Sequence, residues 1–381
     1  MKYRTMGKTG VRVSALGFGT MRLPLTDDGA VDEEEAVRIL RAGIDGGVNY
    51  VDTAYPYHGG FSETVVGKAL QDGYREKVWL ADKCPVWLLE KEGDFEKFLD
   101  EQLQKLQTDH IDFYLLHALN RKRFEEKVKK FSLIERMEEA RKQGKIKFIG
   151  FSFHDTLDVF EDILQYTDQW DFCQIQYNYI NLDYQAGQKG LKMAADRGLG
   201  VVIMEPLLGG SLARLSEHVA ACLPEGKTPV EYAFDFLWDQ PEVSLLLSGM
   251  GAMDQVEENL SYGDRCDVGM MTQKEKQSLL RAKEIFDRMA LVSCTACRYC
   301  MPCPFGLDIP ASLAAWNMTA LDEDDARKAY EALEKEGVTI LEPEEFQADA
   351  CRGCGHCERV CPQHIPVSNV MKQMAEYFSK K

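Results

Sequence analysis

Eight of the twelve cysteines in this 381-residue chain fall into two short runs, and these runs constrain the fold of residues 293–366 more than any other feature. The first run has the spacing C-x2-C-x2-C-x2-C-P and consists of Cys294, Cys297, Cys300 and Cys303. The second has the spacing C-x2-C-x2-C-x3-C-P and consists of Cys351, Cys354, Cys357 and Cys361. Cysteines spaced in this way can lie on one side of a tight loop, and the proline after each run stops the chain from continuing as a helix or strand.

The spacing of the second run is that of bacterial ferredoxins, and the first run is one residue shorter in its last gap. In two-cluster ferredoxins, the fourth cysteine of each run binds the cluster of the other run. This rule predicts one [4Fe–4S] cluster on Cys294, Cys297, Cys300 and Cys361, and a second on Cys351, Cys354, Cys357 and Cys303. Two zinc sites are the alternative, although a cysteine triplet followed by C-P is unusual for zinc. Disulfides would need an oxidising compartment, which nothing in the chain indicates.

Length and charge exclude several classes of protein. A chain of 381 residues is long enough for two or more domains. The formal net charge of -17 argues against a nucleic-acid partner. Residues 1–5 lack the apolar region of a secretory signal, and no stretch approaches 18 uncharged apolar residues. We therefore expect a cytoplasmic protein that does not span a membrane.

Between residues 15 and 265, segments typical of strands alternate with segments typical of helices. Strands are predicted at 15–20, 48–52, 78–83, 111–117, 147–152, 172–177, 200–205 and 243–248. Helices are predicted at 32–46, 62–70, 94–106, 131–143, 156–166, 184–197, 230–238 and 254–262, the first two with Asp32 and Ser62 as N-caps. Eight such units in about 260 residues predict an α/β fold of the (β/α)8 TIM-barrel type. An open doubly wound sheet is the alternative, but no G-x-G-x-x-G follows any strand.

The rest of the chain predicts a small all-helical module. Helices are expected at 272–289, at 309–333 with a break near 317–321, and at 366–378. The expected division is a barrel over residues 1–270, followed by a helical linker and a ferredoxin-like domain with two clusters over residues 271–381.

Four polar residues fall at the carboxyl ends of neighbouring predicted strands, where barrels carry their catalytic groups. Asp52, Lys83 and His117 end the second, third and fourth strands, and Tyr57 lies in the loop after the second. Such a set suits acid–base chemistry on a carbonyl or alcohol. Tyr57 would exchange a proton with the substrate oxygen, Lys83 held by Asp52 would lower the pKa of the phenol, and His117 would donate a hydrogen bond. Each residue alone has a structural explanation, but four at neighbouring strand ends favour a catalytic site.

The segments around these four residues resemble the aldo-keto reductase superfamily, over about residues 1–265. They are Asp52-Thr53-Ala54-x-x-Tyr57, Ser62-Glu63, Lys83 after Val78-Trp79-Leu80-Ala81, and Ile111 to His117. With the cysteine runs, the chain resembles the subgroup that carries a C-terminal 4Fe-4S ferredoxin-type domain. The resemblance implies that Asp52, Tyr57, Lys83 and His117 form a catalytic tetrad and that NAD(P)H binds across the rim.

The resemblance also implies the contacts of this cofactor. Ser152 and Gln176 would hold the carboxamide of the nicotinamide. The pyrophosphate and adenosine would lie along a turn and helix that contain Ser248, Gly249, Gln255, Glu258 and Asn259. The family usually has a lysine or arginine beyond this turn for the 2′-phosphate of NADPH, but none occurs between residues 241 and 264. The choice between NADH and NADPH therefore stays open.

Three functional readings remain open, because a nicotinamide passes two electrons together whereas each cluster passes one. In the first, the barrel performs hydride chemistry on a small carbonyl or alcohol, and the clusters are structural or serve an electron-transfer protein partner. In the second, the clusters feed electrons to a substrate or a flavin in the barrel, although no flavin motif is visible. In the third, the tail is a binding module and the barrel has lost turnover, which the intact tetrad argues against.

A basic run follows His117 in the sequence. It consists of Arg121, Lys122, Arg123, Lys127, Lys129 and Lys130. A solvated helix face is the favoured interpretation, and a docking site for an acidic partner or anionic substrate is the alternative.

Overall fold

The computed structural model describes residues 1–289, 291–319, 323–333 and 348–379, and the chain forms two compact units. The first unit comprises Met1–Pro206 and Val230–Thr272. The second comprises Leu207–Pro229 and Gln273–Lys381. The segment that follows the seventh barrel strand therefore groups with the C-terminal part of the chain.

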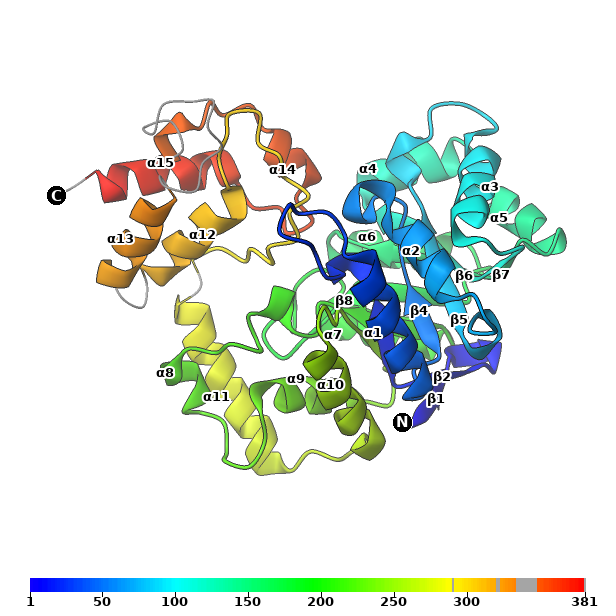
Figure 1. The fold of residues 1–381 in the computed structure, drawn as a ribbon, viewed down its shortest axis with the longest axis horizontal. Helices are drawn as coiled ribbons and strands as arrows, with labels where there is room; N and C mark the ends of the chain where they lie inside the picture. The colour runs from blue at the N-terminus through cyan, green and yellow to red at the C-terminus, as the bar shows by residue number, and fades with distance from the viewer. Residues whose placement is uncertain (290, 320–322, 334–347, 380–381) are drawn as a thin grey trace. The chain divides into compact units, whose positions relative to one another are not determined.

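The first unit is a closed barrel of eight parallel strands, as predicted (Figure 1). In order around the barrel, the strands are β3 (Leu16–Gly19), β4 (Tyr50–Asp52), β5 (Trp79–Cys84), β6 (Ile111–Leu119), β7 (Ile146–Phe153), β8 (Phe172–Gln176), β9 (Gly200–Met204) and β10 (Leu245–Ser248). Pairing of β10 with β3 closes the barrel. An antiparallel hairpin that the sequence patterns did not predict precedes it, made of β1 (Tyr3–Thr5) and β2 (Arg12–Ser14).

The barrel interior is apolar below its polar rim. A buried cluster that includes Tyr50, Ala81, Phe113 and Phe172 fills the interior. Because alternate residues of a strand face the same side, Lys83 continues the inward-facing series of Ala81 at the carboxyl end of β5. The register pairs Asp52 of β4 with Ala81 and Lys83 with Leu115, so polar side chains follow directly above the apolar interior.

Helices surround the barrel in the first unit (Figure 1). They are α1 (Glu33–Asp45), α2 (Ser62–Ala69), α3 (Asp94–Leu106), α4 (Arg121–Arg123), the π-helix η6 (Phe124–Lys129), α5 (Leu133–Lys142), α6 (Leu157–Tyr166), α7 (Gly187–Asp196), α9 (Pro229–Trp238), which starts at the last residue of the segment 207–229, and α10 (Met253–Arg265). The predicted cap Asp32 is confirmed, since its side chain accepts a hydrogen bond from the amide of Glu35. The predicted cap Ser62 is wrong: Phe61 is the N-cap of α2.

The basic run forms α4 and η6 and ends at Lys130, the C-cap of η6, and two of its charges pair with nearby carboxylates. Arg121 contacts Asp158 and Asp162 of α6, and Lys129 lies 2.7 Å from Glu125 one turn earlier. These contacts favour a solvated helix face over a docking site.

The second unit is helical in its described residues. Its helices are α8 (Glu217–Ala220), α11 (Gln273–Met289), α12 (Ile309–Met318), α13 (Glu323–Ala332), α14 (His356–Val360) and α15 (Val367–Phe378). The ring of Tyr330 stacks on that of Phe378 with their centroids 4.1 Å apart, within a core that also buries Leu313 and Met371. The predicted helical break begins where α12 ends, but residues 320–322 lie outside the described residues. Within the described ranges, no helix has the length and apolar character needed to cross a membrane.

Candidate active site and cluster loops

Lys83 is the centre of the polar group at the barrel rim. Its side chain is 0% exposed, and its Nζ lies 2.6 Å from Asp52 Oδ1 and 3.4 Å from Tyr57 Oη. The same nitrogen donates to the main-chain oxygen of Thr53 at 2.6 Å. A buried ammonium is stable only when its charge is paired and its hydrogens are bonded, and these contacts meet both conditions.

Asp52 carries the negative charge of this pair in an equally dry setting. Burial raises the pKa of the Asp52 carboxyl above its usual value, and the neighbouring Lys83 opposes the rise. Within the described residues, Asp52 Oδ1 bonds Lys83 while the buried Oδ2 has no hydrogen-bond partner. Asp52 therefore holds Lys83 through one oxygen.

Tyr57 reaches the group from the turn η3 (Tyr57–Gly60), which lies in the loop after the second barrel strand. His58 and Gly59 have left-handed backbone conformations (φ 52° and 65°), which produce the sharp turn needed at this point. The phenol is 8% exposed, and its ring lies 6.1 Å from that of His117 in an edge-to-face arrangement. Tyr57 is thus close to both Lys83 and His117.

His117 completes the group as a neutral imidazole. Burial lowers the pKa of His117 well below its usual value, and the positive charges of Lys83 and Arg123 lower it further. Its ring lies 5.2 Å from that of Trp87, and its Nδ1 makes no hydrogen bond within the described residues. A neutral imidazole keeps one N–H donor, so it can bond an oxygen without adding a charge.

The two residues predicted to hold a carboxamide lie at the ends of neighbouring strands. Ser152, on β7, is buried and accepts a hydrogen bond of 2.7 Å from the amide of Ala118. Gln176 is the last residue of β8 and is fully buried.

Two hydrogen bonds connect the turn and the helix of the predicted phosphate segment. Asn259 of α10 donates to Ser248 Oγ at 3.1 Å, and Gln255 Oε1 accepts from the amide of Gly251 at 3.0 Å. Glu258 differs from these residues, because its side chain is exposed and only its main-chain oxygen bonds Ser261. The segment thus links the end of β10 to the first turns of α10.

Arg22 is a cation at this segment that the sequence analysis missed. A Cβ placed on Gly249 would meet the Arg22 side chain at 3.3 Å, and one on Gly251 would meet the Arg22 main-chain oxygen at 2.8 Å. Arg22 follows the first barrel strand, and β10 pairs with that strand. Residues 241–264 contain no lysine or arginine, but barrel closure brings a cation from the other end of the barrel sequence.

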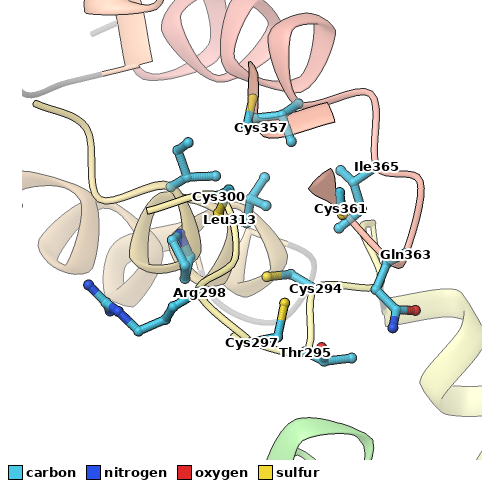
Figure 2. A pocket seen from close by; sticks show the side chains of 13 residues that line it. Cys294, Thr295, Cys297, Arg298, Cys300, Leu313, Cys357, Cys361, Gln363 and Ile365 are labelled. Atoms are coloured by element: carbon cyan, nitrogen blue, oxygen red, sulfur yellow. The ribbon is translucent and has the colours of Figure 1, made fainter. Parts of the chain in front are cut away.

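Five cysteines from the two runs line one pocket of the second unit, and four of them belong to one predicted set (Figure 2). These four are Cys294, Cys297, Cys300 and Cys361, the set predicted for the first cluster. In Figure 2 the sulfur atoms of Cys294 and Cys297 are directed toward the same space, and Arg298 extends away from it. Cys357, predicted for the second cluster, lines the pocket as well, together with apolar side chains such as Leu313 and Ile365.

The thiols of this set are close enough to influence one another. Burial, followed by the charges of Cys297, Cys294 and Cys361, raises the pKa of Cys300 to about 12. The amide of Ala296 donates to Cys294 Sγ at 3.4 Å. Several thiols around one apolar pocket, with an amide donor to sulfur, fit an iron–sulfur cluster. Among the described residues, no three His, Cys, Asp or Glu side chains are arranged to hold a single metal ion.

The second predicted set lies around the core of the same unit. Cys303, Cys351 and Cys357 pack on the apolar core, whereas Cys354 is exposed. Burial is the main cause that raises the pKa of Cys357 to about 11, and the charges of Glu358 and Cys351 contribute.

The two cysteine loops share a backbone conformation. The second and fourth residues after the first cysteine of each run are left-handed: Ala296 and Arg298 (φ 49° and 62°) in the first loop, Gly353 and Gly355 (φ 64° and 69°) in the second. Each left-handed residue turns the chain sharply, so successive cysteines can face one side. The loops are therefore structural repeats, although only the second uses glycine.

The closed barrel carries Asp52, Lys83 and His117 near the carboxyl ends of its strands and Tyr57 in the turn after the second, which defines a barrel enzyme with its polar group in the usual place for this fold. Residues 15–274 match the aldo/keto reductase family, and the chain belongs to this family of oxidoreductases. Residues 293–365 match the 4Fe-4S dicluster domain, so an iron–sulfur domain follows the barrel.

The matches to named relatives span most of each relative's length. The chain is 30% identical over 287 residues to L-galactose dehydrogenase of Arabidopsis thaliana, covering 68% of this chain and 88% of that protein. It is 26% identical over 310 residues to the NADH-specific methylglyoxal reductase of Escherichia coli, covering 68% and 93%. Among solved structures, the holo form of an aldo-keto reductase from Bacillus halodurans is 27% identical, with a TM-score of 0.63 and coverage of 74% and 96%. A Klebsiella pneumoniae aldo-keto reductase in complex with NADPH is 25% identical, with a TM-score of 0.61 and coverage of 74% and 95%.

Proposed function

We propose that the barrel reduces a small carbonyl compound to an alcohol with NAD(P)H, or catalyses the reverse reaction, through Asp52, Tyr57, Lys83 and His117. The observation that carries the proposal is the position of Lys83 Nζ, 2.6 Å from Asp52 and 3.4 Å from Tyr57 in a buried site. This arrangement suits proton transfer to a carbonyl oxygen, because an ammonium beside a phenol makes the phenol proton easier to give up.

The tetrad residues have separate tasks in this mechanism. A bound nicotinamide would supply the hydride to the carbonyl carbon. Tyr57 donates its proton to the carbonyl oxygen, and the Lys83 ammonium stabilises the phenolate that remains. Asp52 keeps Lys83 charged and in place through the contact of 2.6 Å. The pair thus acts on the phenol and leaves the substrate contact to Tyr57 and His117.

His117 orients the substrate oxygen. Its neutral imidazole offers one N–H, and the contact with the Trp87 ring limits its rotation. A neutral donor suits this position, because an imidazolium beside Lys83 would place two cations in a buried site.

The cofactor would be held at two places on the rim. Ser152 and Gln176 would bond the carboxamide of the nicotinamide, and the segment with Ser248, Gly249, Gln255, Glu258 and Asn259 would hold the pyrophosphate and adenosine. We propose Arg22 as the cation of this segment, given its contact with Gly249. The Klebsiella relative in complex with NADPH supports a nicotinamide cofactor.

The iron–sulfur domain would hold two [4Fe–4S] clusters, one on Cys294, Cys297, Cys300 and Cys361 and one on Cys351, Cys354, Cys357 and Cys303. When bound, such clusters pass single electrons. An electron-transfer protein would be their partner, and the reduced thiols would require a reducing compartment such as the cytoplasm.

A second candidate function uses the clusters in catalysis. The dicluster domain favours it, because two one-electron carriers together match the two electrons that a carbonyl reduction needs. In this version, the clusters feed electrons to a substrate or to a flavin in the barrel, and Tyr57 still supplies the proton.

One anaerobic experiment separates the two candidates. In separate reactions, the purified protein is given NADH, NADPH or dithionite with a panel of aldehydes and ketones, and nucleotide oxidation and alcohol formation are measured together. Equal amounts of oxidised nucleotide and alcohol support the hydride mechanism. Alcohol formed only with dithionite, and without nucleotide, would support the cluster-driven version instead.

A further inference from the structure

A buried polar network lies behind Lys83, between β5 and the helices α2 and α3. Its members are Glu63 at the start of α2, Gln102 in α3 and Asp82, the residue before Lys83 in β5. All three side chains are 0% exposed. Residue by residue along β5, Asp82 faces the helices while Lys83 faces the barrel interior.

The Gln102 amide connects the three elements. Its Nε2 lies 2.7 Å from Asp82 Oδ2, 3.0 Å from Glu63 Oε1 and 3.1 Å from the main-chain oxygen of Lys83. Its Oε1 accepts a hydrogen bond of 2.6 Å from Tyr114. With the Tyr114 hydroxyl donating to Oε1, the NH2 group of Gln102 is left to face the carboxyl groups.

Two carboxyl groups at one buried amide cannot both carry a charge without a large cost. Burial, and next the negative charge of Glu63, raise the pKa of Asp82 well above its usual value. Lys105 lies 2.9 Å from Glu63 Oε2 and offers Glu63 a cation. A single proton on the pair, held mainly by Asp82, removes this repulsion and leaves Glu63 paired with Lys105.

The other charged or titratable groups around the pair are few. Lys105 also lies 3.6 Å from Glu101, which accepts a hydrogen bond from Tyr55. On the strand side, the main-chain amide of Lys83 bonds the Asp82 carboxyl group, and Cys84 and Tyr114 are the titratable groups near Asp82. Within the part of the chain that the structure describes, Lys105 and Lys83 are therefore the cations next to the pair.

The network holds the main chain of Lys83 from behind. The Lys83 amide donates to Asp82 Oδ1 at 2.8 Å, and the Lys83 oxygen faces Gln102. Glu63 stands in the helix that follows the Tyr57 turn, so Gln102 ties that helix to the strand of Lys83. The separation of 3.4 Å between Lys83 Nζ and Tyr57 Oη depends on how these two elements are held together.

We propose that Gln102 is a positioning residue that holds the main chain of Lys83 to the helix after Tyr57. It does so while Glu63 and Asp82 share one proton. The position of Lys83 then sets how strongly its ammonium group favours proton loss from the Tyr57 phenol. This inference rests on the proposed function, because it requires Tyr57 as the proton donor.

The kinetic test compares Gln102→Leu and the milder Tyr114→Phe with Gln104→Leu, an exposed glutamine of the same helix. A displacement of Lys83 should lower kcat for carbonyl reduction by about 10- to 100-fold in Gln102→Leu, and by less in Tyr114→Phe. The KM for the nucleotide should stay unchanged. The alkaline limb of the kcat profile should move to higher pH, because a weaker cation leaves the phenol harder to ionise.

Two kinetic results would overturn the inference. In the first, Tyr114→Phe has the kcat and the pH profile of the wild type, and folded Gln102→Leu also has the pH profile of the wild type. The other is a fall in kcat that only tracks the fraction of folded protein, with the alkaline limb unmoved. Gln104→Leu should behave as the wild type in both measurements.

The shared proton has a readout that does not need turnover. Infrared difference spectra of wild type against the near-isosteric Asp82→Asn at neutral pH should show the carbonyl band of a protonated carboxylic acid, which is lost in the variant. If the band is present and the protein reduces no carbonyl with either nucleotide, the proposed function fails while the network stands. If the protein is active and the band is absent, the shared proton is refuted.

Discussion

At the residue scale, Lys83 shows what the barrel needs in order to hold a charge in its interior. The ammonium is fully buried, and contacts of 2.6 Å to Asp52 and to the Thr53 carbonyl replace its lost hydration. Removing one partner of such a pair typically costs about 3–5 kcal/mol, because the other charge is left unpaired. An arrangement this demanding fits a group whose charge is used in chemistry.

Arg22 gives a prediction at the same scale. Arg22→Met should weaken the binding of NADPH by about 1 kcal/mol, or about fivefold in Kd, since the side chain is exposed and a single solvated phosphate contact is worth little more. Fluorescence titration of NADPH and NADH gives both constants. A loss confined to NADPH would assign the 2′-phosphate to Arg22, and an equal loss would assign the pyrophosphate.

The control for this variant is Arg12→Met, which removes another exposed arginine in the hairpin before the barrel. It should leave both constants unchanged. Equal affinities in Arg22→Met and wild type would show that Arg22 does not contact the cofactor.

At the element scale, the two cysteine loops have the same backbone conformation at equivalent positions but different residues there. Ala296 and Arg298 hold left-handed conformations that Gly353 and Gly355 adopt without a steric penalty. The repeat was partly visible in the sequence through the cysteine spacing, but the left-handed positions were not, because the first loop lacks the glycines that signal them.

These positions predict different effects of two substitutions. Gly353→Val should destabilise the second loop by about 1–2 kcal/mol, because a branched side chain disfavours this conformation although no heavy atom lies within 4 Å of an added Cβ. Ala296→Gly should stabilise the first loop or leave it unchanged. The measurement is thermal loss of cluster absorbance in anaerobic protein, and an earlier loss in Ala296→Gly than in Gly353→Val would contradict it.

Some elements and site residues could be predicted from the sequence, and others could not. The eight strands were predictable because buried parallel strands are continuous apolar runs, and Asp32 was predictable as a cap from its local motif. Ser62 was not, because its hydroxyl bonds Thr20 and Thr53 of the barrel instead of its own helix. Gln102 could not be identified either, since a polar residue that faces a buried carboxyl pair has the same pattern as an exposed one.

At the scale of the whole molecule, the segment 207–229 had no signal in the sequence for its grouping. It leaves the seventh barrel strand, yet it belongs to the unit that carries the cysteines. Within that unit, Lys227 pairs with Glu275 of α11 at 2.6 Å, and a Cβ on Gly209 would collide with the Thr295 main chain beside the first cysteine. Such contacts join residues far apart in sequence, and no local pattern encodes them.

The metal content of the whole chain is the next prediction. Protein purified without oxygen should contain about eight irons and eight labile sulfides per chain, as two four-iron clusters require. Cys354→Ala should lose one cluster, and Cys222→Ala, which changes a cysteine outside both runs, should retain both. One or two zinc atoms without labile sulfide would refute the cluster assignment.

The central claim is that the barrel transfers a hydride from a nicotinamide while Tyr57 supplies the proton. The most direct measurement uses NADPH or NADH deuterated at the transferable position, with an aldehyde or ketone that the protein reduces, and mass spectrometry of the alcohol. The account predicts deuterium on the former carbonyl carbon, and turnover about 10²–10⁴-fold lower in Tyr57→Phe. An alcohol without deuterium, or normal turnover in Tyr57→Phe, would contradict it.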